Sequence, residues 1–232
     1  MRVLAIDTAS DAATVAVAED NVLIGESILN HKKTHSQKIM VMIERLMSDL
    51  EIEASDIDYF AAAVGPGSFT GLRIGVATAK ALAHSCYKPV VGVSTLEGLA
   101  YNLPCTEDVI APIMDARRNN VFNAAYRFSG GALETVVEPN VCGAEECFAR
   151  LSDYNVIFTG DGVNVHKDRI GELFSRQARL APVSHRMSRA SSVAMCAFDK
   201  IARGEITPYN ELAPVYLRLS QAERELQERK KK

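Results

Sequence analysis

The chain has 232 residues, of which 47% are hydrophobic, and its formal net charge at pH 7 is −3. This length can bury the core of one large domain or two small lobes, and the charge gives no general attraction to nucleic acid or membrane. The five cysteines include no C-x-x-C pair, so neither a disulfide framework nor a zinc site is indicated. No apolar run is long enough to span a bilayer, and Asp7 interrupts the start too early for a secretory signal. We therefore expect a cytoplasmic protein.

The first half of the sequence alternates between strand and helix patterns. It opens with an expected antiparallel meander of three strands, over Arg2–Thr8, Ala12–Ala18 and Val22–Leu29. A helix is expected next over Ser36–Leu50, with Ser36 as its N-cap. Two strand–helix pairs follow: Tyr59–Val64 with Leu72–His84, and Lys88–Val93 with Ser94–Tyr101.

The opening pattern returns after a break at Leu103–Thr106. Val109–Ala116, which contains Asp115, echoes Val3–Ala9, which contains Asp7. The remaining expected elements are strands at Val121–Phe128, Leu133–Val137 and Val156–Thr159, and helices at Ala144–Leu151, Val163–Phe174 and Arg189–Arg203. Two copies of one α/β pattern predict a duplicated architecture, with lobes at residues 1–104 and 105–218 and a charged tail at 219–232. The layout resembles the actin, hexokinase and Hsp70 (ASKHA) superfamily, which binds ATP between two such lobes.

The run Gly65–Gly75 is the most informative motif in the sequence. It follows an apolar strand pattern and precedes a helix pattern. Such a turn leaves backbone N–H groups free at a helix N-terminus, where an anion can bind. Ser68 or Thr70 can cap the helix. The alternative is a purely structural strand-to-helix turn, since short glycine motifs often match by chance.

Five segments resemble the bacterial TsaB family of threonylcarbamoyladenosine biosynthesis proteins, in the family's order along nearly the whole chain: Leu4–Ala9, His35-Ser36, Gly65–Ala83, Gly92–Leu96 and Pro214–Arg218. The resemblance implies an ASKHA-like fold with a degenerate nucleotide cleft. It implies a non-catalytic scaffold that acts with TsaD and TsaE in threonylcarbamoyl transfer to the adenosine next to the tRNA anticodon. It also implies a heterodimer with TsaD, a homodimer when alone, and indirect or weak tRNA contact, for which Arg117, Arg118 and the tail are the expected basic surface.

Two departures from the catalytic relative TsaD point away from an enzyme. TsaD has glycines at the second phosphate turn, whereas this chain has Arg117 and Arg118, which would crowd a nucleotide although arginine can also pair with phosphate. The two metal-binding histidines of TsaD, spaced i and i+4 on a helix, correspond to Thr95 and Leu99, which cannot replace imidazoles. We therefore expect no catalytic residue, no cofactor and no bound metal.

Several alternatives remain open at this stage. The first lobe keeps a degenerate candidate site for an anion or nucleotide, at Asp7, Thr8, Gly65, Gly67 and Ser68. Asp7 could equally be a turn-forming residue at a strand end. His31 and His35 share i, i+4 spacing, but two lysines lie between them and no carboxylate or cysteine is near in sequence. The alternative function is an autonomous ASKHA-type small-molecule kinase. A metalloprotease is a third possibility, but this chain lacks the histidine pair that would bind its metal.

The first two expected helices are the candidate partner surface. The apolar arc of the first helix is wider than a one-sided surface helix needs, and its methionines suit adaptable contacts. The second helix repeats small residues at i, i+4 intervals, which lets another helix or strand approach closely. Packing within the chain is the alternative for both. The expected interface consists of Ile39, Met40, Met42, Ile43, Met47, Leu72, Gly75, Val76, Ala79, Lys80 and Ala83.

Overall fold

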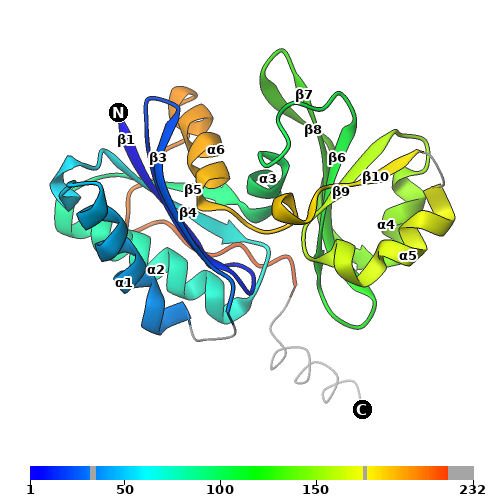
Figure 1. Ribbon diagram of the computed structural model, residues 1–232, viewed down its shortest axis with the longest axis horizontal. Coiled ribbons are helices and arrows are strands. Elements are labelled where there is room, and N and C mark those ends of the chain that lie inside the picture. Colours follow the sequence, from blue (N-terminus) through cyan, green and yellow to red (C-terminus); the bar gives the residue numbers. More distant parts are fainter. Residues whose placement is uncertain (32–34, 175–176, 219–232) are drawn as a thin grey trace.

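The computed structural model describes residues 1–31, 35–174 and 177–218, which form two lobes side by side (Figure 1). Each lobe is built on a five-stranded sheet, in the orders β3-β2-β1-β4-β5 and β10-β9-β6-β7-β8. In both sheets an antiparallel meander lies on one side of the first strand and parallel strands lie on the other. The duplicated α/β architecture predicted from the repeated opening pattern is thus confirmed. The charged tail expected at 219–232 lies outside the described residues.

The first lobe follows the predicted order of elements. Its strands and helices are β1 (Arg2–Asp7), β2 (Ala13–Glu19), β3 (Val22–Leu29), α1 (His35–Asp49), the 3-10 turn η1 (Ala54–Asp56), β4 (Tyr59–Gly65), α2 (Phe69–Cys86), β5 (Val90–Ser94) and α3 (Thr95–Ala100). Ser68 and Ser94 precede α2 and α3 as N-caps. The prediction of Ser36 as an N-cap is wrong, because α1 already begins at His35.

The second lobe repeats the arrangement. It contains β6 (Val109–Asp115), β7 (Asn120–Ser129), β8 (Ala132–Gly143), α4 (Ala144–Leu151), β9 (Val156–Thr159), α5 (Gly162–Phe174), β10 (Ala178–Leu180) and the 3-10 turn η2 (Val183–His185), after which comes α6 (Ala190–Ala202). Strand β10 was not predicted, since three residues are too short to show a period. Within the described part of the chain, no helix has both the length and the apolar character needed to cross a membrane.

Both faces of the first sheet are covered, and this places its core in two layers. Leu4 and Ile6 of β1 pack towards α1 and α2, whereas Val3 and Ala5 pack towards α6. All four are fully buried. Side chains alternate between the two faces of a strand, so a strand buried on both faces reads as a continuous apolar run. The adjacent α3 packs against β6 and β7 of the second sheet and also against α6, so these two helices lie between the sheets (Figure 1).

Helix α6 returns to the first lobe, although the sequence assigned residues 105–218 to the second. Its N-terminus is held by Glu26 of β3, whose Oε1 accepts hydrogen bonds from the Ser191 N–H at 2.9 Å and from the Ser191 Oγ at 2.7 Å. The Glu26 carboxylate also pairs with Arg189. The lobe boundary expected from the repeat is therefore wrong for α6, because helical periodicity does not tell which sheet a helix covers.

The segment after α6 runs along the first lobe and ends between the lobes (Figure 1). Thr207 pairs with Val90, and Leu212 is buried in the core between the first sheet and α1–α2. The Val215 N–H donates to the Val64 carbonyl at 2.7 Å. Arg218 then donates to the Ala116 carbonyl of the second lobe. The C-terminal segment thus joins the two lobes.

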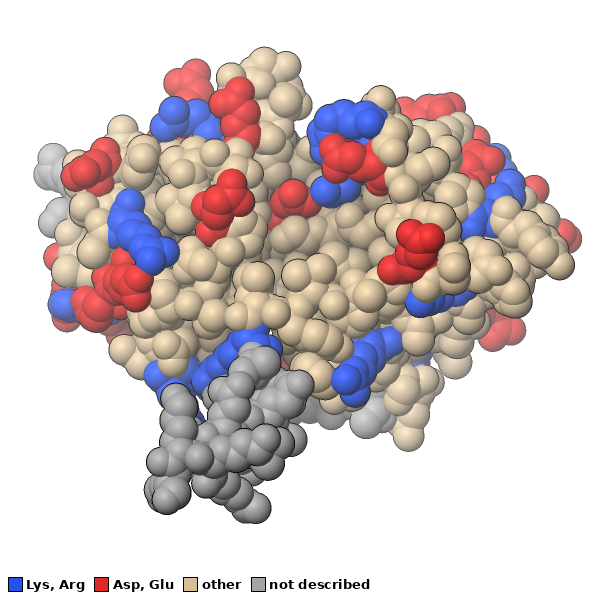
Figure 2. Space-filling view, turned by 180° about the vertical axis from the view of Figure 1, so that it is seen from behind, with Lys and Arg blue, Asp and Glu red and all other residues tan. Residues whose placement is uncertain are grey.

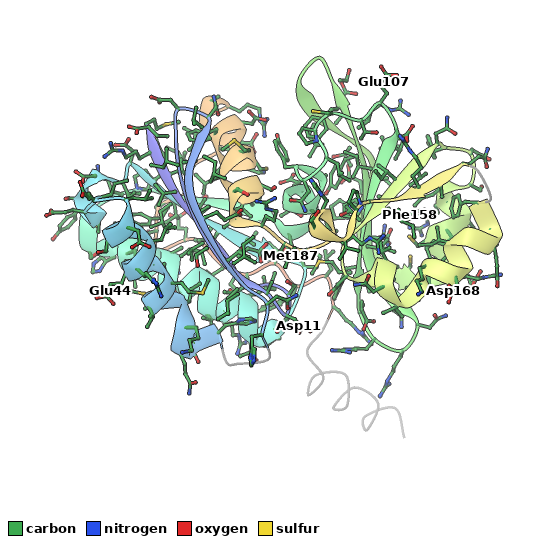
Figure 3. All side chains as sticks on the ribbon, in the orientation of Figure 1. Asp11, Glu44, Glu107, Phe158, Asp168 and Met187 are labelled. Atoms are coloured by element: carbon green, nitrogen blue, oxygen red, sulfur yellow. The ribbon has the colours of Figure 1, made fainter. Side chains whose placement is uncertain are left out.

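The two chain crossings between the lobes are tied to each other. The Asn102 Nδ2 donates to the carbonyls of His185 at 3.0 Å and Met187 at 2.9 Å. Its Oδ1 accepts from the Ser192 hydroxyl at 2.6 Å. Figure 3 shows Met187 at the boundary between the lobes. Asn102 therefore links the outgoing connection to the returning one.

Candidate interlobe cleft and partner surface

Asp7 ends β1 at the floor of the space between the lobes. It is only 2% exposed, and its Oδ1 accepts a hydrogen bond from the Ala9 N–H at 2.8 Å. Burial raises its pKa to about 6, against the opposing effects of the Ala9 N–H and the Ser188 side chain. The neighbouring Thr8 Oγ1 donates to the Gly71 carbonyl at 2.8 Å. The turn that follows β1, which is the first of three turns bordering this space, is therefore buried and held by hydrogen bonds within the chain.

The glycine run packs directly onto this turn. The Ser68 N–H donates to the Ala9 carbonyl at 2.7 Å, and the Gly71 N–H donates to the Ser68 Oγ at 3.3 Å. A Cβ at Gly67 would collide with the Ala9 carbonyl, and one at Gly71 with the Thr8 carbonyl. These glycines allow two backbone segments to approach closely. The structure thus brings the predicted anion-site residues together but uses the Ser68 and Gly71 N–H groups internally, which favours the structural alternative for this turn.

The second turn, between β6 and β7, has an unusual backbone. Three consecutive residues, Arg117, Arg118 and Asn119, have positive φ angles of 66°, 53° and 60°. The Asn120 Nδ2 holds the turn by donating to the Arg117 and Arg118 carbonyls at 3.2 and 3.0 Å. The Arg117 side chain lines the interlobe cavity, as the expected crowding requires, but it is 84% exposed and so borders the cavity on its open side. Arg218 covers the turn at the Ala116 carbonyl.

A third turn at Gly160–Gly162 borders the same space, and sequence reasoning missed it. Gly160 has a φ of +94° and lies so close to the Ile113 carbonyl that no Cβ would fit. The Asp161 Oδ1 accepts from the Asp115 N–H at 3.1 Å. Desolvation raises the pKa of Asp161, and the Asp115 and Asp11 carboxylates add to the shift. The sequence signal that could have identified this turn is a strand pattern followed by two glycines and a helix pattern.

The three turns surround a cavity of about 380 Å³ between the lobes. An adjoining cavity of about 240 Å³ shares four of its lining residues, including Asp11, which Figure 3 shows at the lobe boundary. Carboxylates, arginines and aromatic rings all line the larger cavity: Asp11, Asp115, Asp161, Arg117, Arg218, Phe69, Phe122 and Tyr216. Such a lining can hold a polar molecule that also has an aromatic face.

The positions expected to replace a metal-binding pair lie on α3. Thr95 and Leu99 are both buried there. His35 lies at the start of α1, with its Nε2 2.9 Å from the Ser10 carbonyl, and His31 is exposed. Among the described residues, no three His, Cys, Asp or Glu side chains are grouped so that they could hold a metal ion.

Most of the predicted partner interface is buried within the chain itself. Nine of the eleven residues face the core: Ile39, Met42, Ile43, Met47, Leu72, Gly75, Val76, Ala79 and Ala83. As a partner surface these nine are wrong, because the apolar and small-residue stripes are the inward faces of α1 and α2. The Lys80 ammonium donates to the carbonyls of Asn210 at 3.1 Å and Leu212 at 2.9 Å. Only Met40, which is 49% exposed, faces outwards as predicted.

The outer face of α1 and α2 remains available. Val41, 55% exposed, adjoins Met40 on α1. Ala77 and Ala81 are exposed on α2, and the two helices are in contact with each other. Figure 1 shows both helices on the outer side of the first lobe. The exposed apolar residues of these two helices are thus fewer than the predicted interface contained.

The chain is similar along nearly its whole length to curated proteins. It is 35% identical to "tRNA threonylcarbamoyladenosine biosynthesis protein TsaB" of Bacillus subtilis (strain 168), and the match covers 96% of both chains. It is 31% identical to the protein of the same description from Escherichia coli (strain K12), over 94% of this chain and 95% of that one. Residues 23–226 match the family model described as "TsaD: tRNA N6-adenosine threonylcarbamoyltransferase".

Solved structures support the same assignment of fold. A Pseudomonas aeruginosa protein described as uncharacterized with similarity to peptidase YEAZ superposes with a TM-score of 0.80 at 24% identity, covering 94% of this chain and 99% of that one. Component A of (R)-2-hydroxyglutaryl-CoA dehydratase from Acidaminococcus fermentans reaches 0.53 at 12% identity, over 87% of this chain and 99% of that one. The fold is the duplicated two-lobe α/β fold of the actin and hexokinase type, as predicted. With this fold and these full-length similarities, the chain belongs to the TsaB family.

Proposed function

We propose that this chain is a cytoplasmic, non-catalytic subunit that acts with TsaD and TsaE in threonylcarbamoyl transfer to the adenosine next to the tRNA anticodon. The observation that carries the proposal is the match, over 96% of both chains, to a protein described as a tRNA threonylcarbamoyladenosine biosynthesis protein. A likeness of fold alone would not specify a function. A full-length match within one family does support a shared role.

The structure of the cleft supports a non-catalytic role. A catalytic carboxylate must reach its substrate, whereas Asp7 is 2% exposed beneath the glycine turn. The α3 positions that correspond to metal-binding histidines in TsaD hold Thr95 and Leu99. A small-molecule kinase would instead need the first and second turns open to a nucleotide, and here Ser68 and Arg218 cover them.

The proposed contact surface for TsaD is the outer face of α1 and α2, defined by Met40, Val41, Ala77 and Ala81. These residues are exposed and apolar, and the small alanines allow a partner helix to approach closely. Two copies of the same face can also pair about a two-fold axis. We propose that a homodimer and the TsaD heterodimer compete for it.

Reconstitution of tRNA modification tests the function. Purified TsaD, TsaE, this chain, unmodified tRNA and a source of threonylcarbamoyl-adenylate are combined, and each protein is omitted in turn. We expect modified adenosine only when all three proteins are present. We also expect the same yield with the Asp7→Asn variant, because Asp7 holds no reacting group. Full modification without this chain would contradict the proposal. ATP turnover by the chain alone that Asp7→Asn abolishes would support the kinase instead.

A further inference from the structure

The C-terminal segment brings an aromatic pair to the mouth of the interlobe cavity. Tyr216 stacks on Phe69, with ring centroids 4.3 Å apart and planes inclined by 22°. Arg73 braces the pair, because its Nε donates to the Tyr216 hydroxyl at 3.1 Å and its Cζ lies 4.1 Å from the centre of the Phe69 ring. Tyr216 remains 40% exposed. Phe122 lines the cavity from the second lobe, so both lobes contribute aromatic surface.

Exposed guanidinium groups lie at the turn between β6 and β7, which borders the same cavity through Arg117. Arg117 and Arg118 project from the left-handed turn that Asn120 holds. Arg118 forms no ion pair with any residue that the structure describes, and the Arg117 ion pair with Asp115, at 3.4 Å, involves an 84% exposed side chain and is therefore weak. Figure 2 shows several Lys and Arg side chains along the lower edge of the molecule. Both guanidinium groups are therefore accessible for binding a phosphate group.

Charges of both signs line the cavity: the carboxylates of Asp11, Asp115 and Asp161, and the guanidinium groups of Arg117 and Arg218. A free triphosphate placed inside would meet the carboxylates, which outnumber the guanidinium groups there. An unpaired base is neutral and can enter between aromatic surfaces, while its phosphodiester backbone stays outside beside the arginines. Stacking on aromatic rings, together with a basic path for the backbone, is how proteins bind single-stranded nucleic acid.

We propose that the mouth of the interlobe cavity binds single-stranded RNA, with one base stacked at Tyr216 and the neighbouring phosphates on Arg117 and Arg118. The identity of the natural RNA as tRNA rests on the proposed function; the binding chemistry does not. The site would give the chain a direct contact with tRNA through an unpaired nucleotide. It involves few phosphates, so its affinity is modest and its salt dependence is shallow.

Fluorescence anisotropy with the full chain tests this site, using a labelled 12-nucleotide RNA without secondary structure and, separately, unmodified tRNA. The Arg117→Gln/Arg118→Gln double variant should weaken RNA binding, and the slope of log K against log salt should become shallower by about 1.4, since each lost contact with a single strand contributes about 0.7. Tyr216→Leu should weaken binding about tenfold without changing the salt slope. The matched control is Arg150→Gln/Arg169→Gln, which removes the same charge from exposed helices of the second lobe and should bind as the original chain does.

Each outcome decides for or against the site. Unchanged affinity and salt slope in the Arg117/Arg118 double variant would overturn it, as would equal losses in the control. Binding of AMP or ATP that depends on Tyr216, without binding of either RNA, would also overturn it in favour of a free nucleotide. Because the assay needs no TsaD, a positive result stands even if reconstitution of modification fails. A negative result counts against the site even if the chain supports modification.

Discussion

Thr8 and Gly75 are in direct contact: a Cβ on Gly75 would lie 2.5 Å from the Thr8 Oγ1. The same hydroxyl donates to the Gly71 carbonyl at 2.8 Å. The contact places the small-residue face of α2 against the end of β1. The spacing of small residues that resembles a partner-binding stripe thus serves close packing inside the first lobe.

Gly75→Ala should lower the free energy of unfolding by about 1–3 kcal/mol, because the added methyl group overpacks a rigid contact. Urea unfolding measures the loss. Adding Thr8→Ala, which removes the Oγ1, should recover part of it, as expected for residues in contact. The control is Gly171→Ala on α5, where nothing lies within 4 Å of a new Cβ. Equal stabilities of the two alanine variants would contradict the packing role.

Met40→Glu together with Val41→Glu should weaken both self-association and TsaD binding at least tenfold, since a carboxylate buried at an interface without a partner is costly. Sedimentation measures association. The monomer should keep its stability to within about 0.5 kcal/mol, because both side chains are exposed. Leu173→Glu, at a 46% exposed position on α5, is the control. A monomeric original chain at high concentration would rule out the dimer, and unchanged TsaD binding would rule out this face.

Asp7 should make the stability depend on pH. Burial raises the pKa of Asp7 from its ordinary value of 3.8 to about 6 in the folded chain. The folded state therefore binds the proton more tightly than the unfolded state does. The free energy of unfolding should therefore fall as the pH rises from about 4 to about 6. Asp7→Asn lacks this titration, and its stability relative to the original chain should improve by about 2 kcal/mol between pH 4 and pH 7. Parallel stability curves for the two proteins would contradict the buried titration.

Glu26→Ala should destabilise the chain by about 2–3 kcal/mol, because the Ser191 N–H at the start of α6 loses a charged acceptor and Arg189 loses its partner. Thermal or urea unfolding measures the change. Glu19→Ala provides the comparison, since the Glu19 and Arg2 side chains of that ion pair are 38% and 32% exposed, whereas Glu26 is 7% exposed, and such a partly exposed pair is worth about 1 kcal/mol or less. Similar effects of the two substitutions would show that Glu26 does not anchor α6.

The sequence alone determined most of the segments that become strands and helices, β10 excepted, and that the pattern occurs twice. The apolar run within Arg2–Thr8 and the helical spacing over Ser36–Leu50 are properties of neighbouring residues, so they are readable without a fold. The N-cap of α2, expected at Ser68 or Thr70 and found at Ser68, was likewise a local signal. The resemblance over Leu4–Ala9 and Gly65–Ala83 indicated the TsaB family for the same reason: it lies in short, contiguous motifs.

Only the tertiary structure decided what each surface touches. The stripe containing Gly75 showed that one face of α2 is small, but not that β1 covers it. The destination of α6 depends on Glu26 meeting Ser191, 165 residues later. The cleft mouth depends on Phe69 meeting Tyr216. The periodicity of apolar residues indicates that one face of a helix or strand is buried. Which segment buries that face is set by contacts between distant parts of the chain, and these leave no local signal in the sequence.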